Sequence, residues 1–173
     1  MKTLVLGGVR SGKSRLAERL AAESGRPVTY VATARADDAE MARRIERHRA
    51  DRPGDWGLVE ADTGLARALE QAAGPGQCLL VDCLTLWLTQ LLCTDDEARI
   101  EREREALIET IPGLPGTLVF VSNETGMGIT PMDALSRRFA DEAGWLHQRL
   151  APEMDRVVLT VAGLPHVLKG DLL

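Results

Sequence analysis

The chain has 173 residues, of which 45% are hydrophobic and 27% are charged, and its formal net charge is −5. This length suits one domain with a substantial core and is too short for two such cores, so we expect a single domain over residues 1–173. The acidic balance argues against a nucleic-acid surface, which needs a basic face, and the absence of a secretory leader and of a long uncharged apolar run predicts a cytoplasmic protein with no membrane span.

The first predicted strand, Thr3–Leu6, leads directly into a phosphate-binding loop. Residues 7–14 have the complete G-x-x-x-x-G-K-S spacing, and a helix is predicted from Ser14 to about Ala22. Glycines let successive backbone N–H groups point at phosphate oxygens, the lysine can reach the β- and γ-phosphates, and the last serine can complete the shell of a Mg²⁺ ion. A chance glycine-rich turn is the alternative. The spacing and its flanking elements favour nucleotide binding by Gly7, Gly8, Val9, Arg10, Ser11, Gly12, Lys13 and Ser14.

A basic segment follows the second predicted strand, Val28–Ala32. Residues 43–53 contain five arginines and two acidic residues, a local reversal of charge that favours a polyphosphate-facing surface. A helix predicted from Asp38 to near His48 ends within this segment. Neighbouring guanidinium groups disfavour imidazolium and keep the His48 ring neutral, which is the form that can attack phosphorus. Composition alone nevertheless favours a packed or solvent-exposed histidine on a solvated helix.

A candidate metal ligand follows the strands predicted at Gly57–Glu60 and Leu79–Val81. Asp82 stands at the carboxyl end of the second of these apolar runs, where P-loop proteins place a carboxylate that orients Mg²⁺. The alternative is a helix N-cap for residues Leu84–Leu92. The phosphate loop upstream favours the metal role.

The remaining glycine- and proline-rich turns and apolar runs predict a charged helix over Asp95–Ile111 and strands at Leu118–Ser122 and Val157–Val161. Continuous apolar strands that alternate with helices are typical of a sheet covered on both faces. We therefore expect an α/β fold, a three-layer P-loop NTPase-type domain with a mostly parallel, doubly wound sheet. The three cysteines form no C-x-x-C pair and are expected to be reduced core residues: Cys78, Cys83 and Cys93.

The segment 122–131 carries polar residues followed by two glycines, and it leaves the predicted strand Leu118–Ser122. Ligands of open α/β sheets bind at the carboxyl edge of such strands. An active-site loop is therefore favoured over the alternative, a mobile surface connection.

Taken together, these residues resemble the bifunctional adenosylcobinamide kinase / adenosylcobinamide-phosphate guanylyltransferase family of cobalamin biosynthesis. The resemblance covers nearly the whole chain and rests on the phosphate loop, residues 30–34, residues 44–49 leading into Arg52, Pro53 and Trp56, and residues 122–129. It implies that the chain phosphorylates adenosylcobinamide with ATP or GTP. It further implies that GMP is then transferred from GTP to adenosylcobinamide phosphate through a guanylylated His48, and that the protein is a homotrimer.

The resemblance also implies site residues beyond the phosphate loop. Mg²⁺ would be bound by Ser14 and Asp82, and further nucleotide contacts would come from Thr33, Ala34, Arg35, Arg49, Ala50, Asp51, Arg52, Glu60 and Asp82. Two positions depart from the family pattern. Arg47 stands where some members have a second histidine, which leaves one candidate nucleophile, and Asp82 stands where members have glutamate, so its shorter arm can bind the ion through a water.

Two other classes stay open. A kinase of another small molecule or of a nucleoside monophosphate would share the loop and the size, with Arg137 and Arg138 as lid contacts, but it gives no reason for a lone histidine among arginines. A non-catalytic nucleotide-binding module is the second, and Lys13 together with Asp82 argues against it. His147 and His166 are expected to serve structure or to contact solvent, and no role is predicted for residues after Val161.

Overall fold

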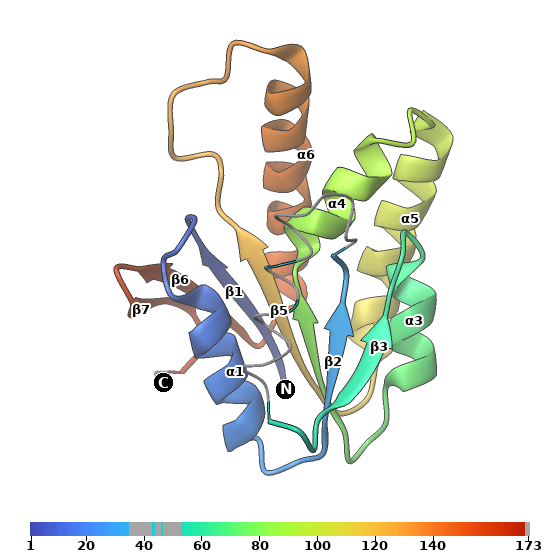
Figure 1. The fold of residues 1–173 in the computed structure, drawn as a ribbon, viewed down its shortest axis with the longest axis vertical. Coiled ribbons are helices and arrows are strands. Elements are labelled where there is room, and N and C mark those ends of the chain that lie inside the picture. The colour runs from blue at the N-terminus through green and yellow to red at the C-terminus, as the bar shows by residue number, and fades with distance from the viewer. Residues whose placement is uncertain (35–42, 44–45, 47–52, 172–173) are drawn as a thin grey trace.

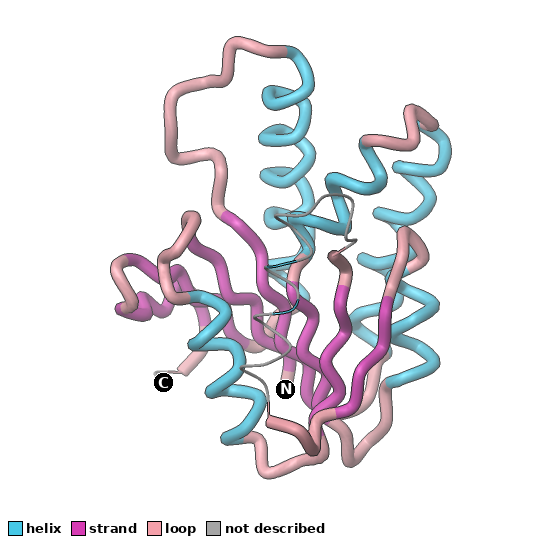
Figure 2. The backbone as a smooth tube through the Cα atoms, viewed as in Figure 1, coloured by secondary structure: helices cyan, strands magenta, loops and turns pink. Residues whose placement is uncertain are grey.

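The computed structural model describes residues 1–34, 43, 46 and 53–171. Its centre is one seven-stranded sheet in the order β3-β2-β4-β5-β1-β6-β7, with helices on both sides (Figures 1 and 2). The strands are β1 (Lys2–Gly7), β2 (Val28–Ala32), β3 (Gly57–Glu60), β4 (Cys78–Asp82), β5 (Thr117–Asn123), β6 (Arg156–Val161) and β7 (Leu164–Lys169). The predicted α/β class is confirmed.

All neighbouring strands are parallel except β6 and β7, which form an antiparallel hairpin. β1 lies between β5 and β6, so that Gly7 at its end is opposite Asn123 on one side and Thr160 on the other. Because β4 and β5 are buried almost throughout, their sequences are continuous apolar runs rather than alternating ones. The carboxyl ends of these strands meet at one edge of the sheet.

The sheet separates two hydrophobic clusters, one on each face. Helices cover both faces (Figure 1). α1 (Lys13–Glu23) covers one face, where Leu16 and Ala17 pack with Val5 and Leu80. The other face carries the larger cluster, centred on Trp87 and Phe120. It is covered by α3 (Leu65–Ala72), α4 (Leu84–Leu92), α5 (Glu97–Thr110) and α6 (Ala134–Leu150), with short 3₁₀ turns η1 (Ile111–Gly113) and η2 (Ala151–Glu153). No helix within the described residues is long and apolar enough to cross a bilayer.

The predicted element boundaries agree with the structure to within about two residues, a usual spread at element ends. The charged helix begins after Asp96, whose carboxylate accepts a hydrogen bond from the Arg99 backbone N–H at 3.0 Å. The helix predicted from Asp38 to His48 lies outside the described residues except for Arg43 and Glu46, which are helical and exposed.

Two expectations are corrected by the structure. β7 was not predicted at all, because most of its side chains are exposed and it contains Pro165, so no apolar pattern marks it. Cys93 is not a core residue: it is exposed at the end of α4, whereas Cys78 and Cys83 are buried.

Candidate functional site

The phosphate loop, residues 7–14, joins β1 to α1 at the carboxyl edge of the sheet. Gly7 has no room for a side chain, because a Cβ there would lie 2.6 Å from the Thr160 carbonyl oxygen and would overlap Ser11 Oγ. Gly12 has a left-handed φ of 95°, and a Cβ on it would lie 3.0 Å from Gly163 Cα. Both glycines are therefore required by the close approach of neighbouring backbone.

The turn between β6 and β7 supports this loop from the side. The Gly163 N–H donates to the Ser11 carbonyl at 2.8 Å, and the Ser11 N–H donates to the Gly8 carbonyl at 3.3 Å. The Lys13 ammonium donates to the same Gly8 carbonyl at 3.1 Å. The carboxyl-terminal hairpin thus holds the backbone that would surround a phosphate.

Lys13 and Asp82 lie within electrostatic reach of one buried thiol. Burial and, second, the Asp82 carboxylate raise the pKa of Cys83 to about 11, against an opposing effect of the Lys13 ammonium. The two charged groups belong to different elements, Lys13 to the start of α1 and Asp82 to the end of β4.

Asp82 is the last residue of β4, and the N-cap position of α4 is Cys83, which makes no side-chain capping bond. Asp82 is thus not the N-cap of that helix. The Thr33 hydroxyl donates to the Cys83 carbonyl at 2.7 Å and accepts from the Cys83 N–H at 2.8 Å. The Gln90 amide donates in turn to the Thr33 carbonyl. Thr33 is fully buried, and this clamp fixes the backbone that carries Asp82.

The donor set at this edge fits Mg²⁺. Ser14 and Asp82 offer hard oxygen ligands, and Mg²⁺ is usually held by one or two protein oxygens together with phosphates and waters. Among the described residues, no group of three or more His, Cys, Asp or Glu side chains could hold a metal alone. The ion would therefore be bound jointly with a nucleotide rather than in a separate protein cage.

The other predicted nucleotide contacts are spread along the same edge. Glu60 ends β3 and is exposed, and it is four strands away from β1, which corresponds to about 19 Å at the usual strand spacing. Glu60 could therefore contact only a part of the nucleotide that lies far from the phosphates that Lys13 would bind. Ala34 is half-buried beyond β2. The remaining candidates lie outside the described residues: Arg35, His48, Arg49, Ala50, Asp51 and Arg52.

The segment after β5 begins beside the phosphate loop. The Glu124 N–H donates to the Gly7 carbonyl at 3.0 Å, and one oxygen of its carboxylate accepts from the Gly126 N–H at 2.6 Å. The other oxygen lies 3.8 Å from Nδ1 of His147, a buried residue of α6. The sequence predicts a structural or solvent-exposed role for His147, and only the packing of α6 brings it to Ser122 and Glu124.

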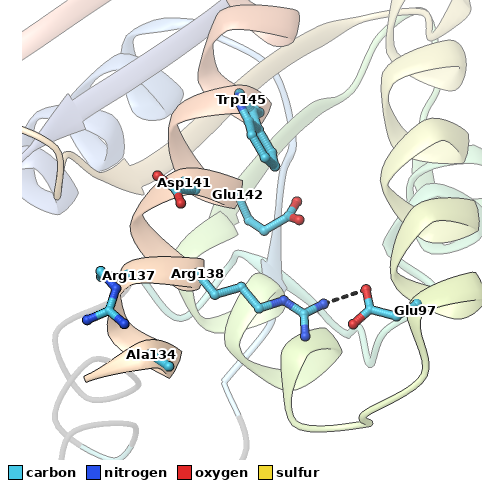
Figure 3. A pocket seen from close by; sticks show the side chains of 7 residues that line it. All are labelled: Glu97, Ala134, Arg137, Arg138, Asp141, Glu142 and Trp145. Carbon is cyan, nitrogen blue, oxygen red and sulfur yellow. Dashed lines mark hydrogen bonds and ion pairs between the residues drawn. The ribbon is translucent and has the colours of Figure 1, made fainter. Parts of the chain in front are cut away.

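A separate hollow of about 530 Å³ lies between α5 and α6 (Figure 3). It is lined by residues of these two helices and by none of the phosphate loop. Arg138 forms an ion pair with Glu97 at 2.6 Å, and Arg137 donates to the carbonyls of Pro131 and Met132. Arg138 is thus paired with α5 and Arg137 with the segment before α6, so neither guanidinium group is placed as a lid over the loop.

The sequence has near-complete relatives among characterised proteins. Residues 3–168 match the family model described as cobinamide kinase / cobinamide phosphate guanyltransferase. The bifunctional adenosylcobalamin biosynthesis protein CobP of Pseudomonas aeruginosa is 60% identical over 171 residues, which cover 99% of each chain. The bifunctional adenosylcobalamin biosynthesis protein CobU of Escherichia coli strain K12 is 40% identical over 177 positions, 95% of this chain and 97% of that one.

Among solved structures, the RadB recombinase superposes with a TM-score of 0.52 over 91% of this chain and 73% of its own, at 14% identity. This likeness concerns the fold alone, and it agrees with the predicted fold class.

Proposed function

Because the chain belongs to the cobinamide kinase / cobinamide phosphate guanyltransferase family, we propose that it carries out two successive transfers on one corrinoid in cobalamin biosynthesis. The first converts adenosylcobinamide to its phosphate, and the second converts that phosphate to adenosylcobinamide-GDP. The observation that carries the proposal is the match over residues 3–168, at 60% identity to a relative named bifunctional. The phosphate loop and Asp82 supply the chemistry that this match requires.

In the first transfer, a hydroxyl oxygen of the corrinoid attacks the γ-phosphorus of ATP or GTP. The new O–P bond forms while the bond from the γ-phosphorus to the bridging oxygen breaks, and the nucleoside diphosphate leaves. Lys13 and the loop N–H groups would hold the phosphates in line, and Ser14 and Asp82 would hold the ion. Mg²⁺, when bound, neutralises charge on the β- and γ-oxygens.

In the second transfer, neutral His48 would attack the α-phosphorus of GTP and release pyrophosphate, which leaves GMP on the imidazole nitrogen. The phosphate of adenosylcobinamide phosphate then displaces the imidazole, a good leaving group once protonated. The arginines near His48 would stabilise the departing pyrophosphate. Thr33, Ala34, Arg35, Glu60 and residues 49–52 would complete the nucleotide contacts, with Thr33 acting through the Cys83 backbone.

The test is covalent labelling. The protein is incubated with Mg²⁺ and GTP labelled at the α-phosphate and then denatured. We expect an acid-labile, base-stable label on wild type that is lost in His48→Ala, while phosphorylation of adenosylcobinamide continues. His166→Ala is the matched control, since His166 is an exposed residue of β7, and it should keep the label.

Label that persists in His48→Ala would exclude His48 as the nucleophile. Absence of label from a wild-type protein that binds GTP would leave a P-loop kinase without a covalent intermediate. The homotrimer and the cytoplasmic location that we propose with this function are tested separately, by light scattering and by cell fractionation.

A further inference from the structure

The end of β5 lies between the two parts of the phosphate site. β5 is hydrogen-bonded to β1 on one side and to β4 on the other, with Asn123 opposite Gly7 and Val121 opposite Asp82. A phosphate chain held by the loop after β1, with its ion at the end of β4, must therefore cross the end of β5. The first residue past that strand, Glu124, is tied to the loop by its N–H bond to the Gly7 carbonyl.

The Glu124 carboxylate is hydrogen-bonded through one oxygen and lies near His147 with the other. One oxygen accepts from the Gly126 N–H at 2.6 Å, and the other faces His147 Nδ1 at 3.8 Å. The Glu124 side chain is 22% exposed to solvent, and the His147 side chain is 9% exposed. The carboxylate is thus ordered by its surroundings and still open to a ligand.

Two hydroxyl groups, from Thr85 and Ser122, lead to the Nε2 side of His147. Thr85 Oγ1 accepts from the Asn123 N–H at 2.7 Å, so its own proton is available to Ser122 Oγ, 3.5 Å away. The Ser122 hydroxyl can then donate to His147 Nε2 at 2.8 Å. In the neutral ring this leaves the proton on Nδ1, the nitrogen that faces Glu124. Burial lowers the pKa of His147, which favours that neutral ring, although the Glu124 carboxylate opposes the shift.

The order of the groups excludes a serine nucleophile. Ser122 is 2% exposed and lies beneath α6, so no substrate reaches its hydroxyl. His147 contacts Ser122 Oγ through Nε2 and faces the Glu124 carboxylate with Nδ1, so its ring lies between the two groups. Ser122 and His147 are therefore buried behind the Glu124 carboxylate, which is the group of the three that solvent and a ligand can reach.

From this arrangement we infer that Glu124 is the catalytic base of the phosphoryl transfer and that His147 is its positioning residue, an inference that rests on the proposed function. As the acceptor oxygen bonds to the γ-phosphorus and the diphosphate leaves, the acceptor proton passes to the Glu124 carboxylate and then to water. In the guanylyl transfer the attacking imidazole nitrogen carries no proton, so no base is needed at that atom as the N–P bond forms and pyrophosphate leaves. The two transfers thus differ in their need for Glu124.

The test compares three activities in the intact protein: phosphorylation of adenosylcobinamide by MgATP, slow hydrolysis of MgATP by water, and self-labelling by α-labelled GTP. Glu124→Gln keeps an oxygen for the Gly126 N–H but cannot take a proton. We expect its kcat for phosphorylation and hydrolysis to fall by about 10²- to 10⁴-fold. Its KM for ATP should stay within about threefold and its GTP labelling should persist. Glu70→Gln, an exposed residue of α3, is the control and should leave all three unchanged.

His147 is tested by a pair of amides. An asparagine amide can stand where Nδ1 faces Glu124, whereas a glutamine amide reaches toward Ser122. His147→Asn should therefore retain more kcat than His147→Gln, and His147→Ala should lose about 10- to 100-fold at unchanged KM for ATP.

The inference is overturned if Glu124→Gln keeps its kcat within threefold for both acceptors. It is equally overturned if the variant loses labelling and ATP affinity together with kcat, which would show a structural role. Failure of the proposed function has a different signature, because the wild type would then not phosphorylate adenosylcobinamide. The hydrolysis assay would still compare Glu124→Gln with wild type.

Discussion

The three cysteines differ in burial, which together with the thiol pKa decides how readily a cysteine forms an accessible, reactive thiolate. Cys83 is buried, and its pKa is raised to about 11, first by burial and then by Asp82. Burial also raises the pKa of Cys78, whereas Cys93 is exposed at the end of α4. Since alkylation requires an accessible thiolate, the native protein should present one reactive thiol.

We expect iodoacetamide at pH 8 to modify a single cysteine in the native protein and three in denaturant, counted by intact mass. Cys93→Ser should leave the native protein unmodified. Modification of Cys83 at a rate similar to that of Cys93 would contradict the buried setting of the β4 end.

At the scale of single elements, the β6–β7 turn carries a strain that can be relieved. Ala162 has a φ of 52° and Gly163 a φ of 79°, the left-handed pair that two-residue hairpins favour. An alanine in this region costs about 1–2 kcal/mol, whereas a glycine adopts it freely. The turn also donates the Gly163 N–H to the phosphate loop.

Ala162→Gly should therefore raise the free energy of unfolding by about 1 kcal/mol, and Gly163→Ala should lower it by a similar amount. A Cβ on Gly163 meets no atom within 4 Å, so the second variant reports backbone strain alone. Urea unfolding at unchanged m-value measures both. Equal stability of the two variants would show that the turn has another conformation in solution.

At the scale of the whole molecule, a ligand on the phosphate loop should stabilise the entire fold. β1 is an interior strand of the sheet, and the loop after it joins α1 and contacts the β6–β7 hairpin. MgATP at about 100 times its Kd should add about 2.7 kcal/mol, or about 5–10 °C in the melting temperature of a domain of this size. Lys13→Ala should abolish most of this shift, while Arg15→Ala, exposed on the same helix, should keep it. A shift of the same size in Lys13→Ala would place the nucleotide elsewhere.

The sequence predicts the layers and the phosphate site because their signals are local. A phosphate loop needs a strand before it and a helix after it, and continuous apolar runs ending in Asp82 indicate a covered parallel strand. The strand order, which places β5 between Gly7 and Asp82, depends on contacts far apart in the chain. His147 meets Ser122 and Glu124 only through packing of α6 on β5, and β7 has no apolar pattern, so neither could be found by periodicity.

The bracing of the phosphate loop by the last two strands has a consequence for how the protein is made. β1 and the loop are synthesised about 150 residues before Thr160 and Gly163, against which the loop rests. A nascent chain on the ribosome therefore carries the complete motif long before its backbone is held in shape. The loop should therefore reach its binding conformation only after β6 and β7 have been added, however early its own residues emerge.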